Sequence, residues 1–208
     1  MSQEKIGNIE FAQNQLAAAL ESYRASVAIR DRLGKADPSN IGWQLDLSRS
    51  YDKIGDVEVA QGQLAASLES YRQCLSIDGR LAKSDPGNTD WQRGLSWSYH
   101  KIGAVEVAEG RFAAAIESFQ HGFAIADRLA KAEPGNAALQ RDLAKSDEGL
   151  AFGYLQQNSP AEARKALEAG REIMARLTAL SPENAQWKKD LQWFDDQLAT
   201  LNGASPAK

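Results

Sequence analysis

The chain repeats a unit of 48 residues four times and keeps its register along almost the whole length. A proline marks each unit boundary, and an asparagine follows two positions later. The recurring landmarks are Asp37-Pro38, Asp85-Pro86, Glu133-Pro134 and Ser181-Pro182, with Asn40, Asn88, Asn136 and Asn184. A fixed period of about 20–50 residues is typical of stacked repeat arrays, in which each unit buries its apolar face against its neighbours. The register therefore predicts one quasi-linear array over residues 1–201.

Each unit is predicted to form a hairpin of two helices. The asparagine directly after the proline break can cap the first turn of a helix. The apolar residues that follow are spaced by four, four and three, which places them on one face of that helix. A glycine, Gly62 in one copy, then precedes a second apolar series. Both helices span about 21 residues, and the tight turns between them predict an antiparallel pair. In the unit after Asn40 the two series are Trp43, Leu47, Tyr51 and Ile54, then Leu64, Leu68, Tyr71 and Leu75.

The two ends of the chain depart from the full unit. Residues 4–14 match residues 52–62, so the first unit is predicted to begin in the middle of its first helix. The last helix carries apolar side chains on one face only, which is typical of a terminal cap. Residues 202–208 are predicted to be a disordered tail. The predicted divisions are a partial unit at 1–38, full units at 39–86, 87–134 and 135–182, and the capping helix at 183–201.

A family resemblance follows from one stretch of the repeat. The pattern Leu95-Ser96-x-x-Tyr99-x-x-Ile102-Gly103, followed by Ala115-x-x-x-Phe119 and Pro134, resembles the L-G-x-x-Y, A-x-x-x-F and P signature of tetratricopeptide repeats. The units here are about 14 residues longer than the usual unit of about 34. The resemblance implies an all-α fold: a right-handed α-solenoid of antiparallel helical hairpins, a superhelix ending in the capping helix. It also implies that the first helix of each unit lines a concave groove.

Composition argues against several classes of partner. A formal net charge of −4 offers duplex nucleic acid no overall attraction. The chain opens without a basic start, and nowhere do 18 apolar residues follow one another, so we expect neither a targeting signal nor membrane association. The single cysteine, Cys74, fits a reducing compartment, and we expect the cytoplasm.

Motifs for catalysis are missing from the sequence. It has no P-loop, no G-x-G-x-x-G, no H-E-x-x-H and no nucleophile elbow. His121 falls off the apolar series and is predicted to be solvated. Asp195 and Asp196 diverge by about 100° on a helix and cannot converge on one substrate. Cys74 occupies a repeat position shared with small residues, so we expect it to pack as a small hydrophobe. We therefore predict a protein that is not an enzyme, with no cofactor and no metal.

A recurring glutamate interrupts the apolar pattern of the first helices. Two explanations stay open: either the apolar stripe drifts toward Val57 and Val59 as the helix curves, or the carboxylates are paired at the edge of the hairpin. The glutamates are Glu10, Glu58 and Glu106.

A candidate binding surface comes from the side of the first helices opposite the core. Three positions per helix lie roughly 140–200° around the helix from Leu47. By the resemblance, these positions face the concave groove. The sets are Leu45, Arg49 and Asp52; Arg93, Trp97 and His100; Arg141, Lys145 and Glu148; and Lys189, Trp193 and Asp196.

The chemistry of this surface suggests a function. Arginine and lysine could hold the oxygens of an acidic segment or a C-terminal carboxylate, and tryptophan could take an apolar anchor. We therefore predict a protein–protein interaction scaffold that binds a peptide or protein segment. The predicted contacts are Arg49, Asp52, Arg93, Trp97, His100, Arg141, Lys145, Glu148, Lys189 and Trp193.

Two alternatives remain. A helix face opposite a core is polar in any protein, so these residues could simply be solvated. The second alternative is structural: the partial first hairpin leaves apolar residues uncovered, and two copies could pair there as a homodimer. Those residues are Ile6, Ile9, Leu16 and Leu20.

Overall fold

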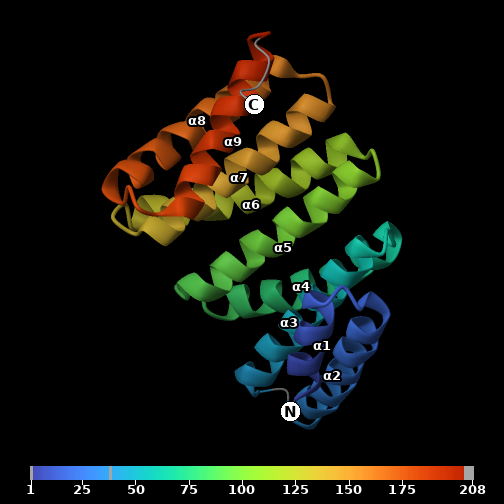
Figure 1. The fold of residues 1–208 in the computed structure, drawn as a ribbon. Helices are drawn as coiled ribbons and strands as arrows, with labels where there is room; N and C mark the ends of the chain where they lie inside the picture. The colour runs from blue at the N-terminus through green and yellow to red at the C-terminus, as the bar shows by residue number, and fades with distance from the viewer. Residues whose placement is uncertain (1, 38, 204–208) are drawn as a thin grey trace. The chain divides into compact units, whose positions relative to one another are not determined.

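The computed structural model describes residues 2–37 and 39–203, and the regular structure in this part of the chain is entirely α-helical (Figure 1), as predicted. The predicted tail begins at residue 202, and residues 204–208 lie outside the described part. The helices are α1 (Gln3–Ala12), α2 (Leu16–Ala36), α3 (Ile41–Ala60), α4 (Leu64–Ser84), α5 (Thr89–Ala108), α6 (Phe112–Ala132), α7 (Ala137–Gln156), α8 (Pro160–Leu180) and α9 (Ala185–Leu201).

The predicted asparagine caps are confirmed. The Asn40 side chain accepts a hydrogen bond from the Trp43 backbone N–H at 3.2 Å, and Asn88 accepts one from Trp91 at 3.1 Å. Asn136 and Asn184 cap α7 and α9 in the same way. Each cap satisfies a backbone donor that the first turn leaves without a partner.

The turn inside each hairpin needs a residue whose backbone adopts the left-handed conformation, with positive φ. Gly62 and Gly110 have φ of 73° and 75°, and the residues 48 positions away, Asn14 and Asn158, both have φ of 58°. Glycine adopts this conformation at no steric cost, and asparagine tolerates it better than most residues. The repeat therefore preserves the turn geometry while its residue type varies.

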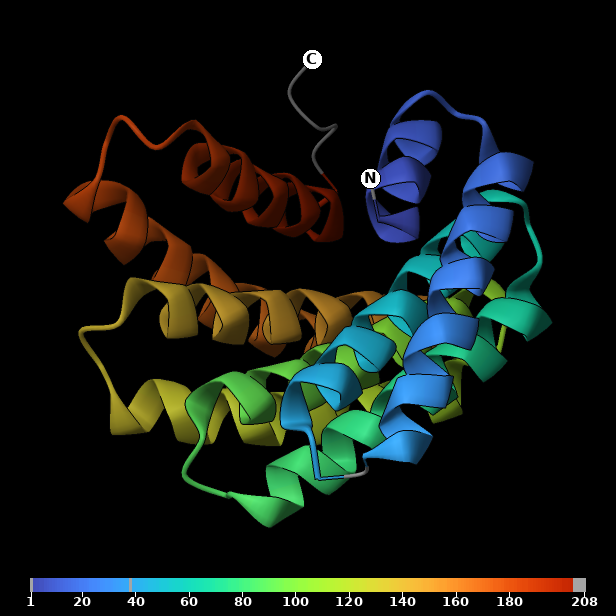
Figure 2. The ribbon, with the colours of Figure 1, turned by 90° about the horizontal axis from the view of Figure 1, so that it is seen from below.

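The chain forms two compact units, each larger than one 48-residue repeat: residues 1–109, called the first unit from here on, and residues 110–208, called the second unit. In the first, α1 to α5 pack in chain order, each against the next; in the second, α6 to α9 do the same. Figure 2 shows that consecutive helices within a unit run in opposite directions. The prediction of one continuous array over residues 1–201 concerns both units together and stays a prediction.

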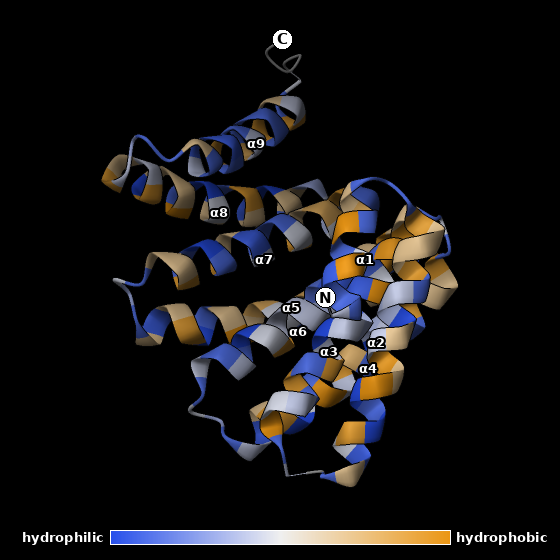
Figure 3. Ribbon diagram, turned by 60° about the horizontal axis from the view of Figure 1, so that its bottom comes forward, coloured by the Kyte–Doolittle hydropathy of each residue, from blue (hydrophilic) through white to orange (hydrophobic). Residues whose placement is uncertain are grey.

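The core of the first unit follows the predicted stripes in part. Leu47 and Ile54 are buried, whereas Trp43 and Tyr51 are only half-buried. Figure 3 shows hydrophobic and hydrophilic residues sharing each helix, as expected when one face packs and the other does not. The most buried side chains lie near the turn that joins the two helices of a hairpin. There a tyrosine of the second helix packs between the two helices. Its members are Leu68, Tyr71, Ile102 and Val105 in one cluster, and Ala19, Leu20, Tyr23, Ile54 and Val57 in another.

These tyrosines lie directly against glycines of the preceding helix. A Cβ added at Gly55 would come within 2.5 Å of the Tyr71 ring, and one at Gly7 within 2.8 Å of the Tyr23 ring. Tyr71 Oη donates a hydrogen bond to Asp56 at 2.8 Å. Burial raises the pKa of Tyr23 to about 12, so its phenol stays neutral and donates. The glycine therefore sets how closely the two helices of a hairpin approach.

Glu10 and Glu58 are paired within the hairpin, as the second of the two explanations predicts, but Glu58 is buried and does not lie at the hairpin edge. Ser70 Oγ donates to Glu58 at 2.7 Å, and Ser22 Oγ donates to Glu10 at the same distance. Glu58 is only 3% exposed and also accepts a hydrogen bond from the Arg24 guanidinium at 3.3 Å. A buried carboxylate needs such partners because an unpaired one is costly.

We predict that Gly55→Ala destabilises the first unit by about 2–4 kcal/mol, because the new methyl group cannot fit under the Tyr71 ring. The measurement is the free energy of unfolding by urea titration. Gly79→Ala is the matched control: Gly79 lies inside α4, and its nearest neighbour would be 3.9 Å from the added Cβ. That change should be neutral or stabilising by up to about 1 kcal/mol. Equal effects of the two substitutions would contradict the packing argument.

Candidate functional site

A groove in the first unit lies between α3 and α5 and has α4 as its floor. It contains a pocket of about 510 Å³, which we call the acidic pocket. The two walls and the floor come from helices that pack in series, with α4 contacting both α3 and α5. The pocket is lined by Leu45, Ser48, Arg49 and Asp52 of α3, Cys74 and Asp78 of α4, and Asn88, Asp90, Trp91, Gly94, Trp97 and Ser98 of the α5 segment.

The floor of the acidic pocket is a buried carboxylate held by hydroxyl groups. Ser48 Oγ donates to Asp78 Oδ1 and Ser98 Oγ to Asp78 Oδ2, each at 2.6 Å. Cys74 Sγ donates to the same carboxylate at 3.4 Å. Burial and the charge of Asp78 raise the pKa of the Cys74 thiol to about 12, so it is a neutral donor. Cys74 is buried, as predicted, but it hydrogen-bonds to polar groups and does not pack simply as a small hydrophobe.

Two indoles form the α5 wall. Trp97 is 48% exposed, and Trp91 is half-buried. The His100 ring stacks on Trp97, with ring centres 5.0 Å apart and planes at 11°. Between the two indoles stands Gly94, where an added Cβ would lie 3.7 Å from Asp78 Oδ2. The missing side chain at Gly94 leaves the buried carboxylate open to the pocket.

The rim carries charged groups that already have partners. Arg49 pairs with Asp46 at 3.5 Å, and Arg93 pairs with Asp90 at 3.9 Å. Asp52 lies 4.0 Å from the Lys101 ammonium. Burial raises the pKa of Asp52, because the lowering effect of Lys101 does not fully compensate for lost hydration.

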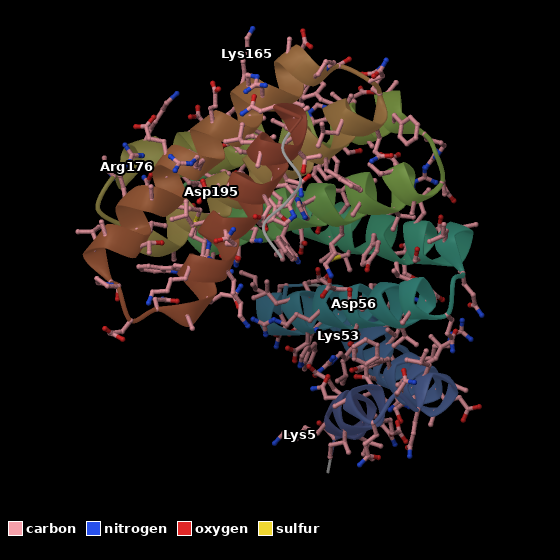
Figure 4. The ribbon with its side chains drawn as sticks, turned by 45° about the horizontal axis from the view of Figure 1, so that its top comes forward. Lys5, Lys53, Asp56, Lys165, Arg176 and Asp195 are labelled. Carbon is pink, nitrogen blue, oxygen red and sulfur yellow. The ribbon has the colours of Figure 1, made fainter. Side chains whose placement is uncertain are left out.

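A second pocket of about 420 Å³ lies beyond Lys101 in the same groove, and we call it the apolar pocket. Lys101 separates the two pockets: its ammonium donates to Asp56 at 2.5 Å and lies 5.6 Å from the centres of both the Tyr71 and Trp97 rings. Asp56 also lies 3.7 Å from Lys53, one turn away on α3 (Figure 4). The lining residues are Phe11, Asp56, Val59, Leu64, Tyr71, Lys101, Ala104, Val105 and Ala108.

In the second unit, the predicted basic residues are engaged by α9. Arg141 Nε donates to Asp190 at 2.7 Å, and Lys145 lies 3.4 Å from the same carboxylate. Burial alone would raise the pKa of Asp190, but the hydrogen bonds from Arg141 and Gln186 and the charge of Lys145 outweigh it, so the pKa is lowered. Glu148 accepts from Lys145 at 2.6 Å. This cluster ties α7 to α9.

The remaining predicted residues of this unit stand apart from that cluster. Lys189 is exposed, and the half-buried Trp193 meets Phe194 edge-on at 5.1 Å. Asp196 accepts from Gln192 at 2.7 Å. His121 is exposed, as predicted. Charged side chains also cover α8: Lys165 and Arg176 point away from the helices in Figure 4.

The structure thus brings together only part of the predicted set. Arg49, Asp52 and Trp97 share the acidic pocket, while Arg93 and His100 contact its rim and wall from outside. Sequence reasoning missed the pocket floor and the Trp91 wall. One signal was available: the repeat position of Asp78 carries a charge in two copies inside an otherwise apolar face. Its residues are Arg30, Asp78, Ala126 and Met174.

Within residues 2–37 and 39–203, the structure holds no group of three or more histidine, cysteine or acidic side chains placed to bind a metal ion. In the same part of the chain no helix combines the length and apolarity that crossing a bilayer requires.

Part of the sequence and the whole fold resemble known proteins. A sequence model of the tetratricopeptide repeat matches residues 48–80, in α3 and α4. No curated protein gives a significant match. The crystal structure of BtubC (BKLC) from P. vanneervenii aligns with a TM-score of 0.65 and 18% identity, over 90% of this chain and 66% of that one. The apo form of RapI aligns with a TM-score of 0.63 and 14% identity, over 97% of this chain and 49% of that one.

A third structure matches along most of both chains. It is a putative kinesin light chain from Podosopora anserina with nearly identical TPR-like repeats, at a TM-score of 0.58 and 18% identity, covering 96% of this chain and 94% of that one. By contrast, this chain spans 66% of BtubC and about half of RapI. Identities this low show a shared fold.

The serial packing of antiparallel helices defines the class as α-helical repeat proteins. Within it, residues 48–80 match the tetratricopeptide repeat, and the solved TPR-like structures share the fold.

A buried carboxyl in the second unit provides a test of its packing. Asp147 is 4% exposed, and burial together with the charge of Asp127 raises its pKa to about 7. The folded state therefore holds this proton more tightly than the unfolded state does. The associated stability is fully present below about pH 4 and is lost as pH rises through about 7.

We predict that Asp147→Asn removes this pH dependence and raises the free energy of unfolding at pH 8 by about 1–3 kcal/mol. Urea titrations between pH 4 and pH 8 measure it. Glu168→Gln removes an exposed carboxylate from α8 and should leave the slope unchanged. If the Asp147→Asn variant kept the original slope, Asp147 would not be the group responsible.

Proposed function

We propose that the groove between α3 and α5 binds an extended segment of another protein, so that the chain acts as a non-catalytic interaction scaffold. The observation that carries this proposal is the exposed indole of Trp97 beside a pocket of about 510 Å³. A large aromatic side chain left half in solvent at a concave site is typical of a binding surface.

The frame of the groove supports the same proposal. Its floor and the buried sides of its walls belong to packed helices, with Leu68, Tyr71, Ile102 and Val105 in one cluster. A groove built on rigid helices loses little conformational entropy when a segment binds. Its length, divided into two pockets by Lys101, suits an extended chain that places a side chain in each.

The residues of the second unit are proposed as a further contact surface. Arg141, Lys145 and Glu148 form the cluster around Asp190, and Lys189 and Trp193 lie on α9. Because Arg141 and Lys145 are held by Asp190, they would contact a partner through their remaining donors. An acidic partner segment, expected from these basic residues, is the chemistry that this surface would favour.

We predict that peptides selected from a random library of about 12 residues bind the full chain and lose at least about tenfold in affinity with Trp97→Ala. The loss follows from removing an exposed indole that a bound segment would cover. Fluorescence anisotropy with labelled peptides gives the affinities. Leu180→Ala is the control, because Leu180 is 79% exposed and lies on α8 of the other unit. Selected peptides that bind both variants like the wild type would remove the groove from the proposal.

A second candidate function is self-association through the first hairpin. Ile9 is 47% and Phe11 is 37% exposed on α1, whereas Leu20 is buried. Two exposed apolar side chains on one short helix offer a contact for a second copy. Such pairing would make the chain an assembly element.

We expect, under this second candidate, that multi-angle light scattering finds a dimer at high protein concentration and that Ile9→Glu makes it monomeric. The added charge would be buried at the contact without a partner. Glu21→Gln, an exposed change on α2, serves as the control and should leave the dimer intact. A monomeric wild-type protein at roughly millimolar concentration would end this candidate.

A further inference from the structure

We propose that the acidic pocket receives a cationic side chain, the guanidinium of an arginine or the ammonium of a lysine, from the bound segment. This inference rests on the proposed function of the groove and specifies the chemistry of its occupant. It differs from the acidic partner that the sequence suggested, because the pocket's own charges have the opposite sign.

The charges lining the pocket favour a cation. Asp52, Asp78 and Asp90 line it, against the single basic residue Arg49. Arg49 is itself paired with Asp46 at 3.5 Å outside the lining. Asp90 is likewise paired with Arg93 at 3.9 Å, and Asp52 lies 4.0 Å from Lys101. The attraction for an incoming cation therefore comes chiefly from Asp78, whose described partners are neutral.

The floor gives this attraction a specific target. Asp78 is 8% exposed and lines the pocket, and its described partners are two hydroxyls and a thiol. None of these donors carries a charge that would neutralise the carboxylate. A buried carboxylate held only by neutral donors gains strongly from a cation that reaches it with good geometry. Burial raises the pKa of Asp52 at the rim despite the nearby Lys101, so a further cation there would favour the charged form of this carboxyl.

The walls supply the second element of recognition. Trp91 and Trp97 present indole surface to the pocket, and a guanidinium stacks well on such rings. The Trp97 ring already contacts the Lys101 ammonium at 5.6 Å and stacks with His100, so an incoming cation would stack first on Trp91. Gly94 leaves the path between the indoles and Asp78 unobstructed. A volume of about 510 Å³ exceeds what one long side chain needs.

The apolar pocket adds a requirement for the neighbouring side chain. Beyond Lys101 it is walled by Phe11, Val59, Leu64 and Val105. A segment that fills both pockets therefore carries a basic residue and an apolar residue close together. Lys101 stands at the division and would repel a basic side chain from the apolar pocket.

The test uses the full chain and single-residue probes: acetyl-arginine methylamide, acetyl-lysine methylamide and acetyl-glutamate methylamide. Binding is followed by NMR through the indole N–H signals of Trp91 and Trp97, assigned with Trp→Phe variants. We expect the arginine probe to shift these signals and to bind at least about tenfold more tightly than the glutamate probe.

Variants locate the contact. Asp78→Asn should weaken the arginine probe by about fivefold or more, because the carboxylate charge is removed while the side-chain shape is kept. Gly94→Leu, which fills the pocket and keeps every charge, should weaken it as well. Asp31→Asn removes the same charge from a side chain on α2 that is 42% exposed and does not line the pocket, so it should change nothing. Circular dichroism shows which variants remain folded, and Asp52→Asn at the rim replaces Asp78→Asn if the latter does not.

Each outcome decides the inference. Tighter binding of arginine or lysine that depends on Asp78 or Asp52 and on Gly94 supports it. Equal or tighter binding of the glutamate probe overturns it but leaves the proposed groove intact. No binding of any probe, or binding unaffected by all these variants, also overturns it. The separate peptide selection with Trp97→Ala then decides whether the groove binds a segment at all.

Discussion

The close approach of two helices at a glycine is the interaction on which the first unit depends. At Gly55 the absence of a side chain lets the Tyr71 ring lie on the backbone of α3, and the same contact joins Gly7 to Tyr23. This contact sets the spacing inside each hairpin, and buried pairs such as Ser70 with Glu58 then fit that spacing. Because α4 packs against both α3 and α5, the strip of α4 that carries Cys74 and Asp78 becomes the floor of the groove. The shape of the groove therefore depends on the contact between Gly55 and Tyr71 beneath it.

Much of the helical architecture could be predicted from the sequence, because helix starts and turns are set by residues close together in the chain. The helix starts follow from asparagines such as Asn40, whose side chain caps whichever turn comes next. Arg49 and Trp97, which the helical projection placed on the same side of their helices, line one pocket. The depth of the pocket was beyond that projection, since it depends on a third helix placing Asp78 beneath the other two.

The charges show the same limit more sharply. From the sequence, Arg141 and Lys145 were expected to be basic groups available to a ligand. In the structure both contact Asp190, which lies far along the chain on another helix. Side-chain pairing between helices is set by tertiary distance, and a helical projection treats each helix alone. The sign of a binding surface therefore follows from which charges remain without an opposite charge after folding, as the carboxylate of Asp78 does among its described partners.

The variation at the repeat position of Asp78 has a consequence for how such a chain diversifies. The four copies hold arginine, aspartate, alanine and methionine there, while the glycine and asparagine residues of the turns preserve the backbone. Arg30 at the first of these positions donates a hydrogen bond to Ser50, whereas Asp78 accepts one from Ser98, the serine 48 residues further along. One site per unit can thus switch between positive, negative and apolar character through a change of one residue, and the scaffold around it need not be rebuilt.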